Sequence, residues 1–242
     1  MVSSQADQDR FYPGQPKQEL GGQRNVTMEN LLHLLLGWLL GLTTLGIAEW
    51  IRRDYRKREL VASVAGELAD LQYVIAVVAF RLRTHLGDGT DEFLDWLIPI
   101  IREYDGPSRI PRMRDNLLKI RGYPEAERRV ADLARRQHDV GVGLVRYDLP
   151  FLTAQSAELS ICPLDFQRGV SWVKWQLDYF NQRVDFLRSQ YEKTFDAAIV
   201  GDNRVVIETN LTNGYKDLAS RAESIAKAIG DIRTKYRPKG AT

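Results

Sequence analysis

The residues that could carry out nucleophilic or acid–base chemistry are few in this sequence. There is one cysteine, Cys162, and there are three histidines, His33, His85 and His138. A thiolate beside a histidine is the nucleophile of several enzyme classes, so Cys162 with His138 or His85 is a candidate site. We favour the ordinary alternative, in which a single thiol of a helical protein is a small buried apolar side chain. A single cysteine also excludes an intrachain disulfide framework and a cysteine-rich zinc site.

The motifs that common reactions require are absent from the sequence. The zinc-hydrolase motif His-Glu-x-x-His does not occur. Di-iron bundles use Glu-x-x-His, but the residues three before His138 and His85 are Arg135 and Leu82. Neither glycine-rich phosphate-binding pattern occurs, nor does the nucleophile elbow Gly-x-Ser-x-Gly. We therefore predict no catalytic residue, no metal site and no cofactor. An enzyme with an unrecognised site is our third interpretation.

Positive charge gathers between residues 109 and 136. The seven arginines of the candidate anion or phosphate patch are Arg109, Arg112, Arg114, Arg128, Arg129, Arg135 and Arg136. Such a patch can bind phosphates, a nucleotide or a membrane surface, but more often it is the solvated face of amphipathic helices, which we favour. Aromatic residues do not alternate with these arginines, and 34 basic against 32 acidic residues leave a net charge of only +2. Both facts make nucleic acid an unexpected partner.

An apolar segment, residues 30–51, is the strongest signal in the chain. It carries no acidic or basic residue until Glu49, and as a helix it is about 30 Å long, the thickness of a bilayer's hydrocarbon core. We predict a transmembrane helix that acts as a signal anchor. The alternatives are a buried core helix and a signal peptide cleaved after Gly46-Ile47-Ala48; the length of the apolar run disfavours both.

A basic juxtamembrane segment, residues 52–58, follows directly. Its five basic residues are Arg52, Arg53, Arg56, Lys57 and Arg58. The positive-inside rule then places the rest of the chain in the cytoplasm and the N-terminus outside. The same residues could also recognise anionic lipid, and a role in topology alone is at least as good an explanation.

Small residues form one face of the predicted transmembrane helix. They are Gly37, Gly41, Thr44 and Ala48, and His33 lies on the same face. Small residues at this spacing let two membrane helices approach closely. We therefore expect the membrane as one partner and a second copy of the chain as another, so that the protein is a homo-oligomer.

The remaining sequence predicts an all-α protein. Residues 1–29 are expected to be a flexible polar tail, with Met28 as an alternative start, and residues 59–242 a cytoplasmic helical domain. Apolar residues at 3-4 spacing predict long helices to about residue 86 and over 165–201, and a last long helix whose apolar stripe runs from Tyr215 to Tyr236. Prolines concentrate between residues 99 and 163, where we expect short helices over 91–104, 108–121 and 124–141 and an irregular segment after them.

Two details of the long helices are further expectations. The last two helices should form an antiparallel hairpin because their connection near Gly201 is short. A second apolar stripe, Trp172, Trp175 and Tyr179, predicts that residues 165–201 form the central helix of the bundle. The pair Asn213-Gly214 could interrupt the last helix near its start.

These features favour a single-pass membrane-anchored helical bundle with a coiled-coil-like core. We expect it to act through contact with an unknown cytoplasmic protein partner, as a scaffold or assembly factor. The alternative is a membrane-active signalling or defence effector that oligomerises through its transmembrane helix. The sequence does not identify a ligand, a partner or a trigger.

Overall fold

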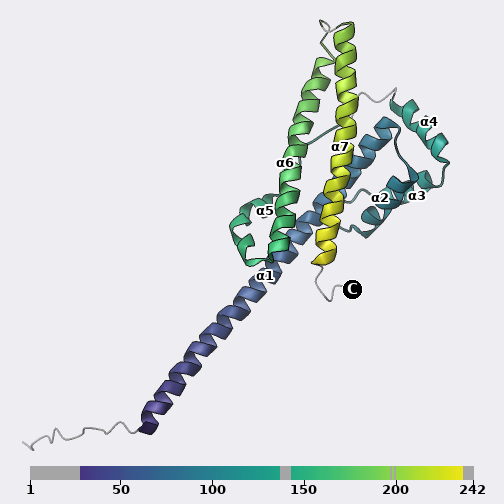
Figure 1. Ribbon diagram of the computed structural model, residues 1–242. Coiled ribbons are helices and arrows are strands. Elements are labelled where there is room, and N and C mark those ends of the chain that lie inside the picture. Colours follow the sequence, from purple (N-terminus) through teal and green to yellow (C-terminus); the bar gives the residue numbers. More distant parts are fainter. Residues whose placement is uncertain (1–27, 137–142, 197, 199, 237–242) are drawn as a thin grey trace, which may run out of the picture. The chain divides into compact units, whose positions relative to one another are not determined.

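The computed structural model describes residues 28–136, 143–196, 198 and 200–236, and every regular element in these ranges is a helix (Figure 1). The elements are α1 (Met28–Leu86), α2 (Asp91–Glu103), α3 (Met113–Arg121), α4 (Glu125–Arg136), α5 (Pro150–Ala154), the 3-10 helix η1 (Ser156–Ile161), α6 (Leu164–Lys193) and α7 (Asp202–Lys235). The predicted all-α class is confirmed. Of the expected tail, residues 1–27 lie outside the described residues, while residues 28 and 29 already belong to α1.

The described chain divides into two compact units after Ile51. The first unit is the apolar part of α1, whose side chains are exposed along its whole described length. The second unit begins at Arg52 and contains the whole buried core, whose first member along the chain is Leu60.

The predicted end of the first long helix, at about residue 86, is confirmed. Gly87 adopts φ of +69°, a left-handed conformation that glycine takes without strain and that commonly ends a helix. Thr90 then caps α2, because its hydroxyl oxygen accepts a hydrogen bond from the Phe93 amide. The connection between α1 and α2 is therefore only four residues long.

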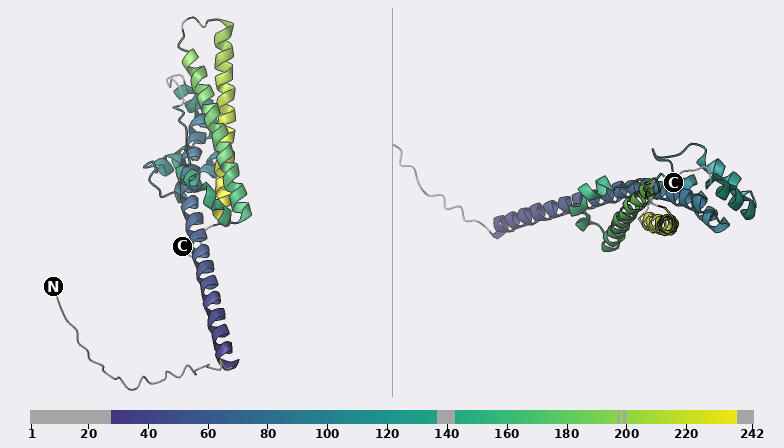
Figure 2. Two further views of the ribbon diagram at one scale, coloured as in Figure 1. Left: turned by 90° about the vertical axis from the view of Figure 1, so that its left-hand side faces the viewer. Right: turned by 90° about the horizontal axis from the view of Figure 1, so that it is seen from above.

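The last two long helices form the predicted hairpin, and Figures 1 and 2 show them side by side. The ring of Phe166, near the start of α6, packs edge-on against Tyr236, just after the end of α7. The 3-4 stripes of both helices are buried, as their spacing predicted: Val170, Val173, Leu177, Phe180, Val184 and Leu187 on α6, and Tyr215, Leu218, Ala222, Ile225, Ile229 and Ile232 on α7. This hairpin is the main packing unit of the helical domain.

The suggested break at Asn213-Gly214 is wrong, because α7 passes through both residues without interruption. Gly214 is buried against α6, where a Cβ atom would overlap the side chain of Leu187. The glycine is therefore explained by close packing of two helices and not by a turn.

The prediction that α6 is the central helix is also wrong. Trp172 is 40% exposed and Trp175 is 61% exposed, so the second stripe of α6 faces away from the core. Two other helices are buried over a wider arc: α1, where eight of the nine residues 71–79 are buried, and α7, which packs on α6 and is hydrogen-bonded to α1. Small residues give α7 this wide buried arc: Gly214, Ala219, Ala222 and Ala226.

Polar contacts fix α7 against α1. The side-chain amide of Gln72 donates to the backbone carbonyl of Ala226 at 2.9 Å, and its oxygen accepts from Arg233 at 2.6 Å. Arg83 of α1 donates to the carboxylate of Glu223 at 2.7 Å. Gln72 is buried, so these bonds satisfy polar atoms that would otherwise be costly to remove from water.

The middle of the chain forms short helices, as expected, but α3 begins at Met113 and not at residue 108. Pro111 precedes Arg112, which adopts a left-handed φ of +60°, and the preceding chain is held by two tyrosines. The Tyr104 hydroxyl accepts from the Ser108 amide at 3.1 Å and donates to Asp70, while Tyr73 accepts from the Ile110 amide. Desolvation and the bond to Asp70 raise the pKa of Tyr104, which keeps its hydroxyl a donor.

The segment between α4 and α6 is irregular, as its prolines predicted. Glu67 of α1 accepts hydrogen bonds from the Phe151 and Leu152 amides at 2.8 and 2.9 Å and so caps α5. The buried Asn181 of α6 pairs with both the amide and the carbonyl of Tyr147. Side chains of α1 and α6 therefore form hydrogen bonds with backbone groups of this segment that have no partner within the segment itself.

Candidate functional site

The small-residue face of residues 30–51 is sterically open within this chain. A Cβ atom built on Gly37 or Gly41 meets nothing within 4 Å. The Thr44 hydroxyl donates to the Leu40 carbonyl at 2.7 Å, so this polar group is satisfied by its own helix. Together with Ala48, these residues leave the backbone of this face accessible. Residues 30–86 include the only helix of the described chain that is long and apolar enough to cross a membrane.

The basic juxtamembrane residues differ in what they contact. Arg56 donates from Nε to Glu158 of η1 at 3.1 Å, and Arg58 pairs with Asp54 at 2.7 Å. Both arginines are exposed, so each ion pair contributes little free energy of folding. Arg52 and Arg53 are exposed and Lys57 is half-buried. The five charges therefore do not act as one uniform cluster.

The structure separates the arginines of the candidate anion patch into groups. Arg109, Arg112 and Arg114 surround a small pocket of about 100 Å³ before and at the start of α3. Within this group Arg109 pairs with Asp105 at 3.0 Å, and Arg114 with Asp115 at 3.2 Å. Arg128 and Arg129 lie on α4, and the side chains of Arg135 and Arg136 lie outside the described residues.

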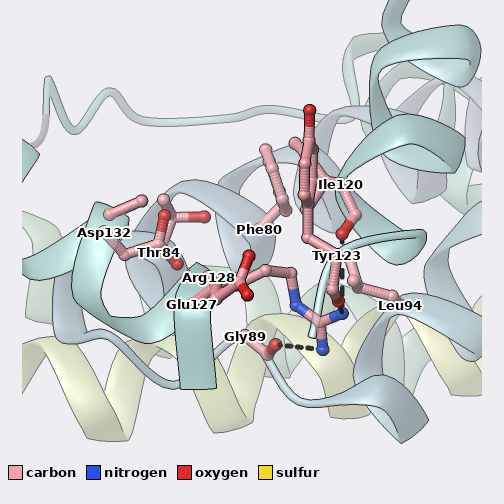
Figure 3. Close-up of a pocket in the computed structure, with 10 residues that line it drawn as sticks. Phe80, Thr84, Gly89, Leu94, Ile120, Tyr123, Glu127, Arg128 and Asp132 are labelled. Atoms are coloured by element: carbon pink, nitrogen blue, oxygen red, sulfur yellow. Dashed lines mark hydrogen bonds between the residues drawn. The ribbon is translucent and has the colours of Figure 1, made fainter. Parts of the chain in front are cut away.

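A cavity of about 370 Å³ lies among α1, α2, α3 and α4 (Figure 3). Its apolar wall comes from all four helices and the turn between α3 and α4: Phe80, Leu94, Ile120, Tyr123 and Ala131. Its polar lining consists of Thr84, Glu127, Arg128, Asp132 and the backbone of Gly89. A concave, mainly apolar site with a few polar groups is the usual form of a small-molecule site.

Arg128 is the most deeply buried polar side chain of this cavity. It is only 6% exposed, and one terminal nitrogen donates to the Tyr123 carbonyl at 2.6 Å. The other terminal nitrogen donates to the carboxylate of Asp91, and Figure 3 shows it reaching the Gly89 carbonyl. Asp91 also pairs with Arg121 at 3.0 Å. The arrangement joins α4 to α2 and α3 and fixes the guanidinium group.

One nitrogen of that guanidinium group remains without a partner. The Nε atom of Arg128 is buried and makes no hydrogen bond to any residue that the structure describes. A buried donor of this kind is uncommon, because desolvation without a bond is unfavourable. An acceptor supplied to the cavity would satisfy it.

Polar residues near the α1–α2 turn line a second cavity of about 450 Å³. Arg129 and Lys216 lie there with Asp88 and Glu125, and Gly89 contributes to both cavities. The mixed charge of this lining gives no preference for an anion. Arg129 therefore lines the second cavity, and Gly89 is the residue that the two linings share.

The candidate nucleophile Cys162 is buried, as the favoured interpretation predicted. Burial raises the pKa of its thiol, although Lys57 opposes this effect, so the thiolate form is disfavoured. His85 packs edge-on against Tyr215 with 5.4 Å between ring centroids. His138 lies outside the described residues.

Sequence reasoning missed the cavity and the burial of Arg128. The apolar wall residues lie on separate helices, and only the packing of those helices brings them together. In the sequence, Arg128 cannot be distinguished from the solvated arginines around it. No pattern in the neighbouring residues predicts its contacts with Asp91 and Tyr123.

This chain matches no family model, no curated protein and no solved structure.

Proposed function

We propose that the protein is a single-pass membrane-anchored helical bundle that acts through protein–protein contact, as a scaffold or assembly factor. The observation that carries the proposal is the first unit: an apolar helical segment long enough to cross a bilayer, none of whose most apolar window is buried. In water such a surface would drive aggregation, whereas a bilayer accommodates it.

The orientation in this proposal rests on charge. The basic residues that follow Ile51 favour the cytoplasmic side, which puts the helical bundle in the cytoplasm and the N-terminus outside. The ion pairs of Arg56 and Arg58 are exposed and lie within α1, a few residues after the apolar segment ends at Ile51. We propose the cytoplasm as the place where the bundle meets its protein partner.

The exposed aromatic side of α6 supports a role in contact with a protein. Trp172 and Trp175 lie one turn apart and both are exposed. Tryptophan is enriched at protein interfaces, where its ring excludes water, and exposed pairs are uncommon elsewhere.

Photo-crosslinking tests the proposed contact. With a photoreactive amino acid at Trp175, we expect one discrete adduct with another protein in intact membranes. The control position is Ser220, which is exposed on α7. An adduct of twice the mass of the chain favours self-assembly, and a lack of any adduct at Trp175 contradicts a role in protein contact.

The alternative function, an effector that oligomerises through its transmembrane helix, is supported by the open face at Gly37 and Gly41. We expect Gly41→Ile to weaken self-association in a membrane-based dimerisation assay, because a branched side chain keeps two backbones apart. The substitution meets nothing in its own chain, so a changed signal reports on contact between molecules.

Leu39→Ile is the matched control for this prediction, because Leu39 is exposed and lies off the small-residue face. It should leave the dimerisation signal unchanged. If Gly41→Ile also leaves the signal unchanged, the small-residue face does not join two copies, and the effector function loses its support.

A further inference from the structure

The side of α6 that faces away from the core carries a row of aromatic residues. Trp172, Trp175 and Phe186 are exposed, and Tyr179 between them is half-buried. Trp172, Trp175 and Tyr179 follow one another at 3-4 spacing, and Phe186 comes one heptad after Tyr179, so the four rings lie along one line of the helix. This aromatic row is about 21 Å long. A straight row at this spacing matches the apolar stripe of another α-helix.

Two arginines, one from each helix of the hairpin, contact the aromatic row. The guanidinium carbon of Arg183 lies 5.1 Å from the centre of the Phe186 ring. The guanidinium carbon of Arg221, on α7, lies 4.1 Å from the centre of the Tyr179 ring. Such cation–π contacts hold positive charge directly beside an apolar surface.

These two arginines share one carboxylate. Nε of Arg221 donates to both oxygens of Asp217 at 3.0 Å. Nε of Arg183 lies 3.4 Å from the same carboxylate, but it is buried and makes no hydrogen bond to any residue in the described part of the chain. Asp217 therefore balances only one of the two positive charges at the edge of the row.

The other charged residues beside the aromatic row do not reverse this excess. Asp185 is already paired with Arg146 at 3.0 Å. Asp178 is the remaining carboxylate on this stretch of α6, while Lys174 and Arg188 are two further basic residues. Positive groups thus outnumber negative groups along the row, and Coulomb attraction favours an acidic partner.

We propose that the aromatic row binds an amphipathic helix of a partner protein, one with apolar side chains at 3-4 spacing and acidic side chains beside them. The apolar side chains cover Trp172, Trp175 and Phe186. An acidic side chain meets Arg183 and supplies the charge that Asp217 does not balance. This inference rests on the proposed protein contact of α6 and names the class of partner.

Synthetic helical peptides are the probes for the test. The first has about four turns, the length of the row, with leucine at 3-4 spacing and glutamate at the other positions. The second has lysine in place of glutamate, and the third has the composition of the first in an order that forms no stripe. Fluorescence anisotropy of labelled peptides measures binding to the full chain in phosphatidylcholine nanodiscs, with empty nanodiscs as the blank. We expect saturable binding of the glutamate peptide, weakened by salt, and at least about tenfold weaker binding of the other two.

Three substitutions place the binding on the aromatic row. Trp175→Ser should abolish it, because Trp175 is the most exposed ring of the row. Leu118→Ser is the matched control and should bind normally, because Leu118 is an exposed apolar residue of α3. Arg183→Gln should weaken binding of the glutamate peptide about tenfold and reduce its advantage over the lysine peptide.

Several results would overturn the proposal. They are the absence of saturable binding of the glutamate peptide, equal or tighter binding of the lysine peptide, and unchanged binding by the Trp175→Ser variant. A crosslinked adduct at Trp175 with twice the mass of the chain would also overturn it, because a second copy would then occupy the row. If the glutamate peptide fails to bind while Trp175 still crosslinks to another protein, the acidic helix is wrong and the proposed protein contact stands. Failure of both experiments contradicts both.

Discussion

Deletion of residues 30–51 is expected to transfer the protein from the membrane to the soluble fraction. These residues form the exposed apolar unit, and a helix of this kind inserts into a bilayer in an effectively irreversible way. The full chain should therefore float with membranes after alkaline extraction. The deletion variant should remain at the bottom of the gradient.

The deletion variant is also expected to stay folded. All residues of the buried core lie between Leu60 and Ile232, so no core contact depends on the deleted segment. Circular dichroism should show a cooperative thermal transition. Replacement of the five basic residues of segment 52–58 by glutamine is a useful control: it should leave flotation unchanged, because the apolar segment supplies the anchoring. A full chain that leaves the membrane at alkaline pH would contradict the prediction.

Substitution of Gly214 by alanine is expected to destabilise the helical domain by about 1–3 kcal/mol, the usual cost of overpacking. The direction of this stability change is informative, because alanine within a helix is intrinsically more favourable than glycine by about 1 kcal/mol. Helix propensity alone would therefore predict that Gly214→Ala stabilises the domain. At this position the new methyl group would overlap Leu187 of the facing helix, and both backbones are fixed by the hairpin. Urea unfolding followed at 222 nm measures the change.

Gly66 provides the matched control. It also lies inside a helix, but a Cβ atom there meets nothing within 4 Å, so Gly66→Ala should be neutral or stabilising. Leu187→Ala in the Gly214→Ala background should cost less than it costs alone, because it removes the overlap. Equal stability of the two single glycine variants would contradict close packing of α6 and α7 at Gly214.

The parts of this fold that the sequence predicted correctly are those encoded by local patterns. The 3-4 stripes specify which faces of α6 and α7 are buried, and Gly87 ends α1 at Leu86. The prolines separate the short helices from the long ones. Each of these signals acts within a few residues, so no knowledge of the tertiary arrangement is needed to use it.

The wrong predictions have a common physical cause. The tryptophans of α6 suggested burial, yet they are exposed because no element of the described chain packs on that side. Alanines such as Ala219 and Ala226 do not form a conspicuous hydrophobic stripe, yet they allow α7 to be buried on two sides. Gly214 has the local signature of a turn but serves helix packing. In each case a partner distant in sequence decides the outcome.

The candidate functional features also divide into those encoded by local sequence and those that depend on residues distant in sequence. The apolar segment and its basic flank are contiguous in sequence, so a candidate membrane span could be recognised from the sequence alone. The cavity depends on Arg128 meeting Asp91 and Tyr123, which come from α2 and from the turn between α3 and α4. Charge counting alone cannot distinguish a buried, paired arginine from a solvated one.

The side of the membrane on which the bundle lies tests the proposed anchoring most directly. A fluorescent protein fused after residue 242 folds only in the cytoplasm of a bacterial host, and alkaline phosphatase at the same position is active only outside it. We predict a fluorescent fusion and an inactive phosphatase, with both proteins in the membrane fraction. An active phosphatase together with a dark fluorescent protein would contradict the orientation set by the basic residues after Ile51, and with it the cytoplasmic partner.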